Sequence, residues 1–355
     1  MFLIEISHHS NFFNLPIIFS IKLFKIFIQF AVSVFIQTMN ISVTFILFAV
    51  LVTAAVISAE RSHEEQRFFK DWCKKHNKKY RSHDEEEAAM ENMLTHKKTV
   101  DAHNQRYHDG EVSYKMHLPH HSDLTMDEIV EHLGGHLQNP DKESYRTARA
   151  AASTPTYTKG PDSIDWVAKG LVGPVEQQGQ CGSCWAFSIA AVVNAYIRKK
   201  NKKATTLVSP QQLVDCDRGT YVLGCKGGNV PLALEYVKKK GMTSEEQYPY
   251  KDYQSKCEYS SAEKVVSVSK YYYVQTNGNE TLMRDVVGSV GPVSIQIILE
   301  PSIYFYSEGM YEPESCDTDD YHAPVIVGYG TDPKQGDYWM VKNSWGKFRD
   351  NSHYK

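Results

Sequence analysis

The chain of 355 residues has little net charge and no pattern typical of a metal site. Its 39 basic and 42 acidic side chains nearly cancel, so nothing suggests a nucleic-acid partner. Beyond residue 155 there is no second C-x-x-C pair and no Cys/His cluster with zinc spacing, and we therefore expect neither a metal nor another cofactor. No internal repeat is apparent, and the length predicts about two domains.

Charged residues are missing altogether between residues 27 and 59. Within this stretch, residues 41–57 form an apolar run that ends at Ser58-Ala59, as in a signal peptide before its cleavage site. We expect residues 1–59 to be a signal peptide region, with translation starting at Met39 and delivery to the secretory pathway, a lysosome or the exterior. A membrane anchor is the alternative, because the joined apolar stretch exceeds the ~20 residues that a spanning helix needs.

Glycine and proline are absent from residues 60–109, where apolar residues recur at helical spacing. This pattern predicts helices at 64–78 and 84–104, and Thr125 with Glu128 predicts a capping box for a shorter helix. Residues 138–163 lose the periodicity and are typical of an open linker that proteases cut. Strands are predicted at 265–274, 293–299 and 323–329. We therefore expect a helical domain at 60–155 and an α+β domain at 156–355.

Cysteine is sparse, with seven in the chain, and the odd number leaves at least one unpaired. Six follow residue 180, which is compatible with disulfides formed in an oxidising compartment. Cys184 precedes an almost wholly apolar run suited to a buried helix, and a helix N-terminus stabilises the nucleophilic thiolate. The alternative for Cys181 and Cys184 is a redox pair or half a zinc site, although no thioredoxin-like βαβ unit surrounds them.

Histidine is scarcer still in residues 156–355, where only His322 and His353 occur. A cysteine nucleophile needs a base and a group that orients the base. His322 opens an apolar strand, and Asn343 could bond its imidazole while Trp345 shields that bond from water. A lone histidine before a strand is usually structural, but the context of Cys184 favours catalysis.

The segment Cys181-Gly-Ser-Cys184-Trp185, with His322 138 residues after Cys184 and Asn343 beyond it, resembles the papain signature. The resemblance implies a papain-like two-lobed fold, with a helical lobe, a β-barrel-like lobe and a cleft between them. It implies hydrolysis of protein and peptide substrates through an acyl-enzyme. Cys184 would attack, His322 would pair with it as an imidazolium, Asn343 would hold the ring, and Gln178 would donate to the oxyanion.

The resemblance also implies structural and substrate-binding residues. The expected disulfides are Cys181–Cys225 and Cys216–Cys257. The residues expected to line the substrate cleft are Gly227, Gly228, Asn229, Val230, Gln296, Ala323 and Trp345. Asn279 begins an Asn-Glu-Thr sequon for N-glycosylation.

Residues 60–155 resemble the inhibitory pro-domain of cathepsin L-type precursors. Glu85 and Asn104 keep the two ends of the motif on its long helix, whereas the interior positions differ: Ala89, Met93, His96 and Val100. Eleven of the 15 histidines lie in this domain. We hypothesise that acidification charges them and promotes activation, and a merely solvated polar face is the alternative. We expect a monomeric zymogen that its own pro-domain inhibits.

The family pattern is interrupted after Gly346, where papain-like chains continue with a further Trp-Gly and a final strand pair. We therefore expect the peptidase domain to be C-terminally incomplete and Cys316 to be unpaired. For this reason the alternative functions are a non-catalytic papain-like homologue and a pro-domain-type inhibitor.

Overall fold

The computed structural model describes residues 62–134, 155–219, 221–318 and 320–346. The chain divides into two compact units, residues 1–81 and 82–355, and each is described by itself. The expected signal region and most of the expected linker lie outside the described residues. Within the described ranges, no helix combines the length and the apolar character needed to cross a membrane.

The described part of the first unit is one helix and a turn. Residues 62–75 are helical, three residues short of the expected end. Asn77 has a left-handed backbone (φ 53°), which ends the helix. Buried Phe69 stacks on Tyr80 at 6.0 Å between ring centroids, and the Lys78 ammonium lies 5.6 Å from the Trp72 ring. The turn therefore folds back on the helix through aromatic contacts.

The second unit begins with the long helix α3 (His83–His108), which is one turn longer than expected at its C-terminal end. Ser82 caps its N-terminus by accepting from the Glu85 backbone N–H, and acidic residues fill the first turn. Its buried stripe consists of Ala89, Met93, His96, Val100 and His103. The short strand β1 (Tyr114–Met116) and helix α4 (Met126–Leu133) follow. The capping box that starts α4 is the expected one, made by Thr125 and Glu128.

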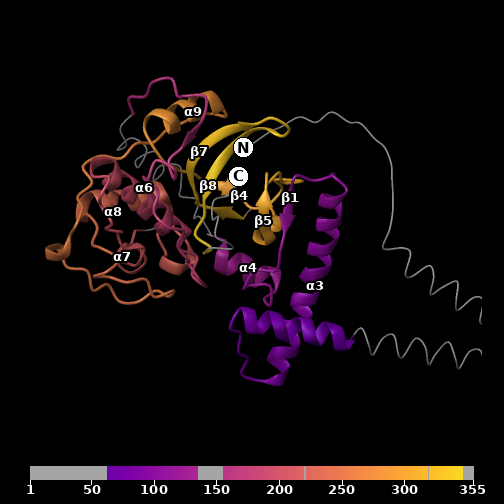
Figure 1. The fold of residues 1–355 in the computed structure, drawn as a ribbon. Helices are drawn as coiled ribbons and strands as arrows, with labels where there is room; N and C mark the ends of the chain where they lie inside the picture. The colour runs from indigo at the N-terminus through magenta and orange to yellow at the C-terminus, as the bar shows by residue number, and fades with distance from the viewer. Residues whose placement is uncertain (1–61, 135–154, 220, 319, 347–355) are drawn as a thin grey trace, which may run out of the picture. The chain divides into compact units, whose positions relative to one another are not determined.

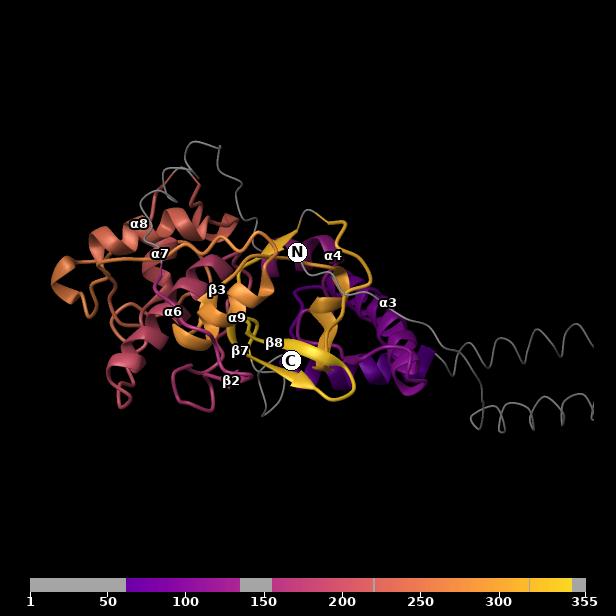
Figure 2. The same ribbon diagram turned by 90° about the horizontal axis from the view of Figure 1, so that it is seen from above.

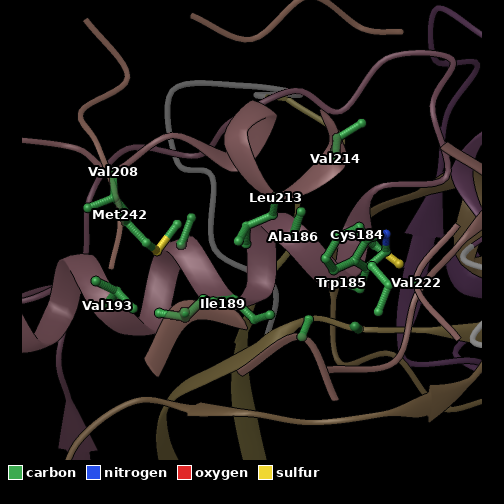
Figure 3. Packing of buried hydrophobic residues seen from close by; sticks show 14 of the residues in the cluster. Cys184, Trp185, Ala186, Ile189, Val193, Val208, Leu213, Val214, Val222 and Met242 are labelled. Carbon is green, nitrogen blue, oxygen red and sulfur yellow. The ribbon is translucent and has the colours of Figure 1, made fainter. Parts of the chain in front are cut away.

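A helical lobe follows, built from α6 (Cys184–Lys200), α7 (Pro210–Cys216), η1 (Gly224–Lys226) and α8 (Val230–Lys240). The apolar run after Cys184 makes α6 buried along most of its length, as its sequence predicts. Figure 3 shows Ile189 and Val193 along α6, with Leu213 of α7 and Met242 packed against them. This core fixes the direction of α6 and therefore the place of its first residue, Cys184.

Short strands build the second lobe. The main sheet has the order β2 (Ile164–Asp165), β7 (Val325–Asp332), β3 (Val293–Ser294), with β8 (Gly336–Lys342) also paired to β7. A separate pair joins β4 (Ile297–Ile298) to β6 (Tyr321–His322). Helix α9 (Glu280–Ser289) packs on β7, and η2 (Ser261–Glu263) and η3 (Pro301–Phe305) lie in the connections. The prediction of an α+β fold is confirmed.

The pro-domain is attached to this second lobe by a strand. β1 pairs antiparallel with β5 (Tyr306–Gly309), with Tyr114 opposite Gly309. In both ribbon views α6, α7 and α8 lie on one side of the strands, and α3 lies on the other (Figures 1 and 2). The pro-domain strand and the β lobe therefore share one small sheet.

Two of the three strand predictions need correction. Residues 265–274 are wrong as a strand: the stretch forms isolated bridges, at Val266 with Met242 and at Tyr272, rather than a strand ladder. Val266 and Val268 instead pack on the helical core, so the alternating pattern came from burial against helices rather than from a strand partner. Residues 293–299 contain two short strands, β3 and β4, rather than one. Pro324, which has no N–H to donate, lies between β6 and β7.

Candidate active site

The Cys184 thiol lies at the first turn of α6. The backbone N–H groups of Cys184, Trp185 and Ala323 are within hydrogen-bonding reach of its sulfur. The disulfide Cys181–Cys225 ties the preceding loop to η1, and the Gly182 N–H donates to the Cys225 carbonyl at 2.9 Å. Since Ala323 follows His322 in the chain, the end of β6 lies directly over the thiol.

The imidazole of His322 is completely buried and held by Asn343. Its Nε2–H donates to the Asn343 Oδ1 at 2.6 Å. The Trp345 indole packs over the ring, with centroids 4.8 Å apart, and excludes water from that bond. Nδ1 has no hydrogen-bond partner among the described residues. This arrangement leaves Nδ1 as the nitrogen available to exchange a proton with a neighbouring thiol.

Gln178 is joined to the Asn343 segment by one backbone and one side-chain hydrogen bond. The Gln178 backbone N–H donates to the Ser344 carbonyl at 2.8 Å, and the Ser344 hydroxyl donates to Gln178 Oε1 at 2.6 Å. The Ser344 N–H also donates to Asn343 Oδ1 at 2.7 Å. Because Oε1 is occupied, the amide NH₂ of Gln178 must face the other way, toward the site.

The pro-domain fills that position. Nε2 of Gln178 donates to the carbonyls of His132 and Leu133, each at 3.3 Å, and to the Cys181 carbonyl at 3.1 Å. The Trp345 indole N–H also donates to the Leu133 carbonyl at 3.3 Å. The C-terminal end of α4 therefore presents peptide carbonyls to the donors that line the site.

Burial disfavours the charged forms of both Cys184 and His322. Desolvation raises the pKa of the Cys184 thiol to about 12, against the smaller opposing effect of the backbone N–H groups. Desolvation also lowers the pKa of His322 to about 4, although the bond to Asn343 acts in the opposite direction. Burial therefore opposes the thiolate–imidazolium pair that the family resemblance implies.

A mixed apolar cluster holds the pro-domain on the β lobe. Val100, Ile129 and Leu133 of the pro-domain share this cluster with Tyr304 and Phe305. The ion pairs Lys115–Glu308 and Arg106–Glu314 add exposed contacts, which contribute little each. The apolar cluster and the β1–β5 pairing therefore supply most of the attachment.

Three pro-domain histidines are buried in or beside this attachment. Nε2–H of His96, His103 and His121 donates to the carbonyls of Leu124, Tyr114 and Tyr304 at 2.9, 3.0 and 3.0 Å. Burial lowers the pKa of His96, and its bond to Leu124 opposes that shift. A solvated polar face does not describe these three side chains.

The remaining predicted residues fall into two groups. The Cys216–Cys257 disulfide is present, and Gly227 adopts φ 102°. No disulfide involves Cys73, Cys184 or Cys316. A Cβ at Gly228 would lie 2.6 Å from the Trp185 indole, so packing on Trp185 already requires glycine there.

The other expected cleft residues have structural positions. The Asn229 side chain caps α8 by accepting from the Leu232 N–H, Val230 packs on the helical core, Ala323 is buried and Gln296 is exposed. Asn279 is exposed and caps α9. No group of three or more side chains suited to a metal ion occurs among the residues described.

Sequence reasoning missed Tyr250, whose hydroxyl joins both halves of the site. It donates to the Gln178 carbonyl at 2.7 Å and lies 2.6 Å from the Ser183 hydroxyl, next to the nucleophile. Tyr250 lies 66 residues after Cys184 in a Tyr-Pro-Tyr segment, and nothing in its local pattern points to the site.

A covered thiol at a helix start, an imidazole held by an asparagine and an amide bound to a pro-segment carbonyl define the precursor of a cysteine peptidase. Residues 160–354 match the model of the papain family cysteine proteases, and residues 69–129 match that of the cathepsin propeptide inhibitor domain (I29). The chain belongs to the papain family of cysteine proteases and is a cathepsin L-type precursor. The non-catalytic alternative finds no support in these matches.

Characterised relatives agree with this assignment. Cathepsin K of Mus musculus is 39% identical over 287 residues, covering 80% of this chain and 85% of that protein. A cathepsin L-like peptidase of Aedes aegypti is 35% identical and covers 82% and 87% of the two chains. Among solved structures, digestive procathepsin L2 from the Tenebrio molitor larval midgut has a TM-score of 0.74 at 30% identity, covering 82% of this chain and 93% of that one.

Proposed function

We propose that Cys184, His322, Asn343 and Gln178 carry out peptide-bond hydrolysis once residues 60–155 leave the peptidase domain at 156–355. The observation that carries this assignment is the position of the Leu133 carbonyl, which accepts from both Gln178 and Trp345. A substrate carbonyl placed at the same donors would lie beside the α6 terminus. The pro-domain then inhibits by occupying the place of the substrate.

The chemistry follows from the proton positions. Removal of the pro-domain rehydrates the site, and the proton of the Cys184 thiol moves to Nδ1 of His322. The thiolate attacks the substrate carbonyl carbon, and the Gln178 amide and the Cys184 N–H stabilise the oxyanion. Imidazolium protonates the leaving amine and leaves a thioester on Cys184. A water deprotonated by His322 then attacks this thioester, which releases the acid and restores the thiol.

Activation by acid fits the buried histidines. His96 has a lowered pKa, so the released pro-domain binds protons more readily than the attached one as the pH falls below about 6.5. Attachment is therefore favoured at neutral pH and weakened in acid. An acidic compartment would convert the precursor, in agreement with a secretory route to a lysosome or the exterior.

Other aspects of the proposal rest on the sequence and on chemistry. Two disulfides favour an oxidising compartment, and Asn279 is exposed for glycosylation. Substrates would be proteins and peptides bound by the main chain near Gly227 and Gly228. We propose a monomer that needs no cofactor and no nucleic acid.

The test uses the full chain after processing in acid. It should hydrolyse a fluorogenic peptide amide, and an epoxysuccinyl reagent should label Cys184 and stop the reaction. Cys184→Ala should abolish both turnover and labelling, whereas Cys316→Ala, which removes an exposed thiol, should leave both unchanged. Persistent hydrolysis by the Cys184→Ala chain would contradict the proposal.

A further inference from the structure

One ion pair of the peptidase domain is buried next to the proposed catalytic residues. Lys342 Nζ lies 3.0 Å from Glu176 Oε2, and the side chains are only 5% and 16% exposed. In comparison, the side chains of Lys115–Glu308 and Arg106–Glu314 are 34–67% exposed. Burying two charges costs desolvation free energy that their mutual attraction repays only in part. The Glu176–Lys342 pair is therefore retained at a cost in stability.

The position of this pair suggests its purpose. Glu176 precedes Gln178 by two residues, and Lys342 directly precedes Asn343. The two segments run antiparallel: the Gly346 N–H donates to the Glu176 carbonyl at 2.9 Å, and Gln177 forms a bridge with Trp345. The ion pair therefore joins the segment that carries the oxyanion donor to the segment that orients the imidazole.

The space around the pair leaves room for movement. Glu176 and Lys342 line a small cavity together with Phe187 and Ser188 of α6 and with Asn343. Side chains beside a cavity are less constrained by packing than those in a filled core. Without the ion pair, the backbone bonds, the Ser344–Gln178 bond and the Tyr250 hydroxyl would be left to hold Gln178, and none of these contacts involves the side chain of Lys342.

We propose that Glu176 and Lys342 are positioning residues whose buried ion pair holds Gln178 in register with Asn343. The inference rests on the proposed role of Gln178 as the oxyanion donor. The reacting pair itself is held separately, Cys184 by α6 and His322 by β6 and Asn343. Loss of the ion pair should therefore impair oxyanion stabilisation more than the reactivity of the thiol.

Two rates measured on the acid-processed full chain test this separation. Glu176→Gln should lower kcat for a peptide amide about tenfold, as expected for a displaced donor, with KM little changed. Alkylation of Cys184 by iodoacetamide, which forms no oxyanion, should stay within about twofold of wild type. Glu258→Gln, at an exposed ion pair with Lys251, is the matched control and should change neither rate.

A second variant separates positioning from folding. Glu176→Met with Lys342→Met removes both charges, so no unpaired charge remains to unfold the chain. A melting temperature near that of wild type together with a reduced kcat supports the proposal. A wild-type kcat in either variant, or an equal fall in the kcat and alkylation rates, overturns it. Wild-type turnover in the same assay reports separately on the proposed function.

Discussion

Replacing Gln178 by alanine should separate turnover from thiol reactivity. Its amide would lose the bond to the developing oxyanion, and removal of one such donor costs about 10²–10³ in kcat, or about 3–4 kcal/mol. In the precursor the same amide makes only two long bonds of 3.3 Å to the pro-domain. Neutral hydrogen bonds of this kind contribute about 1 kcal/mol each, so the loss of both should weaken pro-domain attachment no more than about 30-fold.

The assay compares wild-type and Gln178→Ala chains after acid processing. Active sites are counted by titration with an epoxysuccinyl inhibitor, and kcat is then measured on a fluorogenic peptide amide. The iodoacetamide rate at Cys184 should be nearly unchanged, because the thiol and His322 keep their contacts. A fall in kcat of less than threefold, or a fall matched by the alkylation rate, would refute the assignment of Gln178 to the oxyanion.

Three further variants test the imidazole, the acid switch and the buried acid. Asn343→Ala leaves the buried Nε2–H of His322 without its acceptor, at a cost of about 1–3 kcal/mol, so kcat/KM should fall about 10–100-fold. His96→Gln cannot gain the proton that favours release, so processing should need a lower pH than in wild type or in the exposed control His108→Gln; an unchanged midpoint contradicts this. Burial, and secondarily the Glu176 charge, raises the pKa of Glu245 to about 7 from 4.5. That contribution to stability is therefore present below pH 4.5 and lost as the pH rises to about 7; Glu245→Gln should flatten the melting temperature over this range, and a parallel decline would refute it.

The helices of the pro-domain were predictable because their determinants are local. Thr125 and Glu128 define the start of α4 within four residues, and the apolar positions of α3 repeat at helical spacing. Residues 265–274 failed because alternation reports which side chains are buried but not what covers them. Here helices provide the cover, and the stretch forms isolated bridges at Val266 and Tyr272 instead of a strand.

The residues of the site can likewise be divided into those that the sequence predicts and those that it does not. The sequence identified three candidate site residues, Cys184, His322 and Asn343, because each lies in a short motif whose residue types indicate its chemistry. Tyr250 could not be identified, since its role comes from a hydroxyl that reaches Gln178 across 72 residues of sequence. The sequence also could not predict the direction of the pKa shift of the Cys184 thiol. Its place at a helix N-terminus predicts a lowered pKa, whereas the burial that raises the pKa is visible only in the folded precursor.

That burial would also protect the attached pro-domain from cleavage. Its Leu133 carbonyl accepts from the Gln178 amide and the Trp345 indole, as a substrate carbonyl would. Attack nevertheless requires a thiolate, and burial raises the pKa of the Cys184 thiol and lowers the pKa of His322, so both shifts favour the uncharged pair. The end of α4 occupies these donors, whereas the thiol is also buried by the core cluster of its own lobe. We therefore expect the release of α4 to vacate the donors of Gln178 and Trp345.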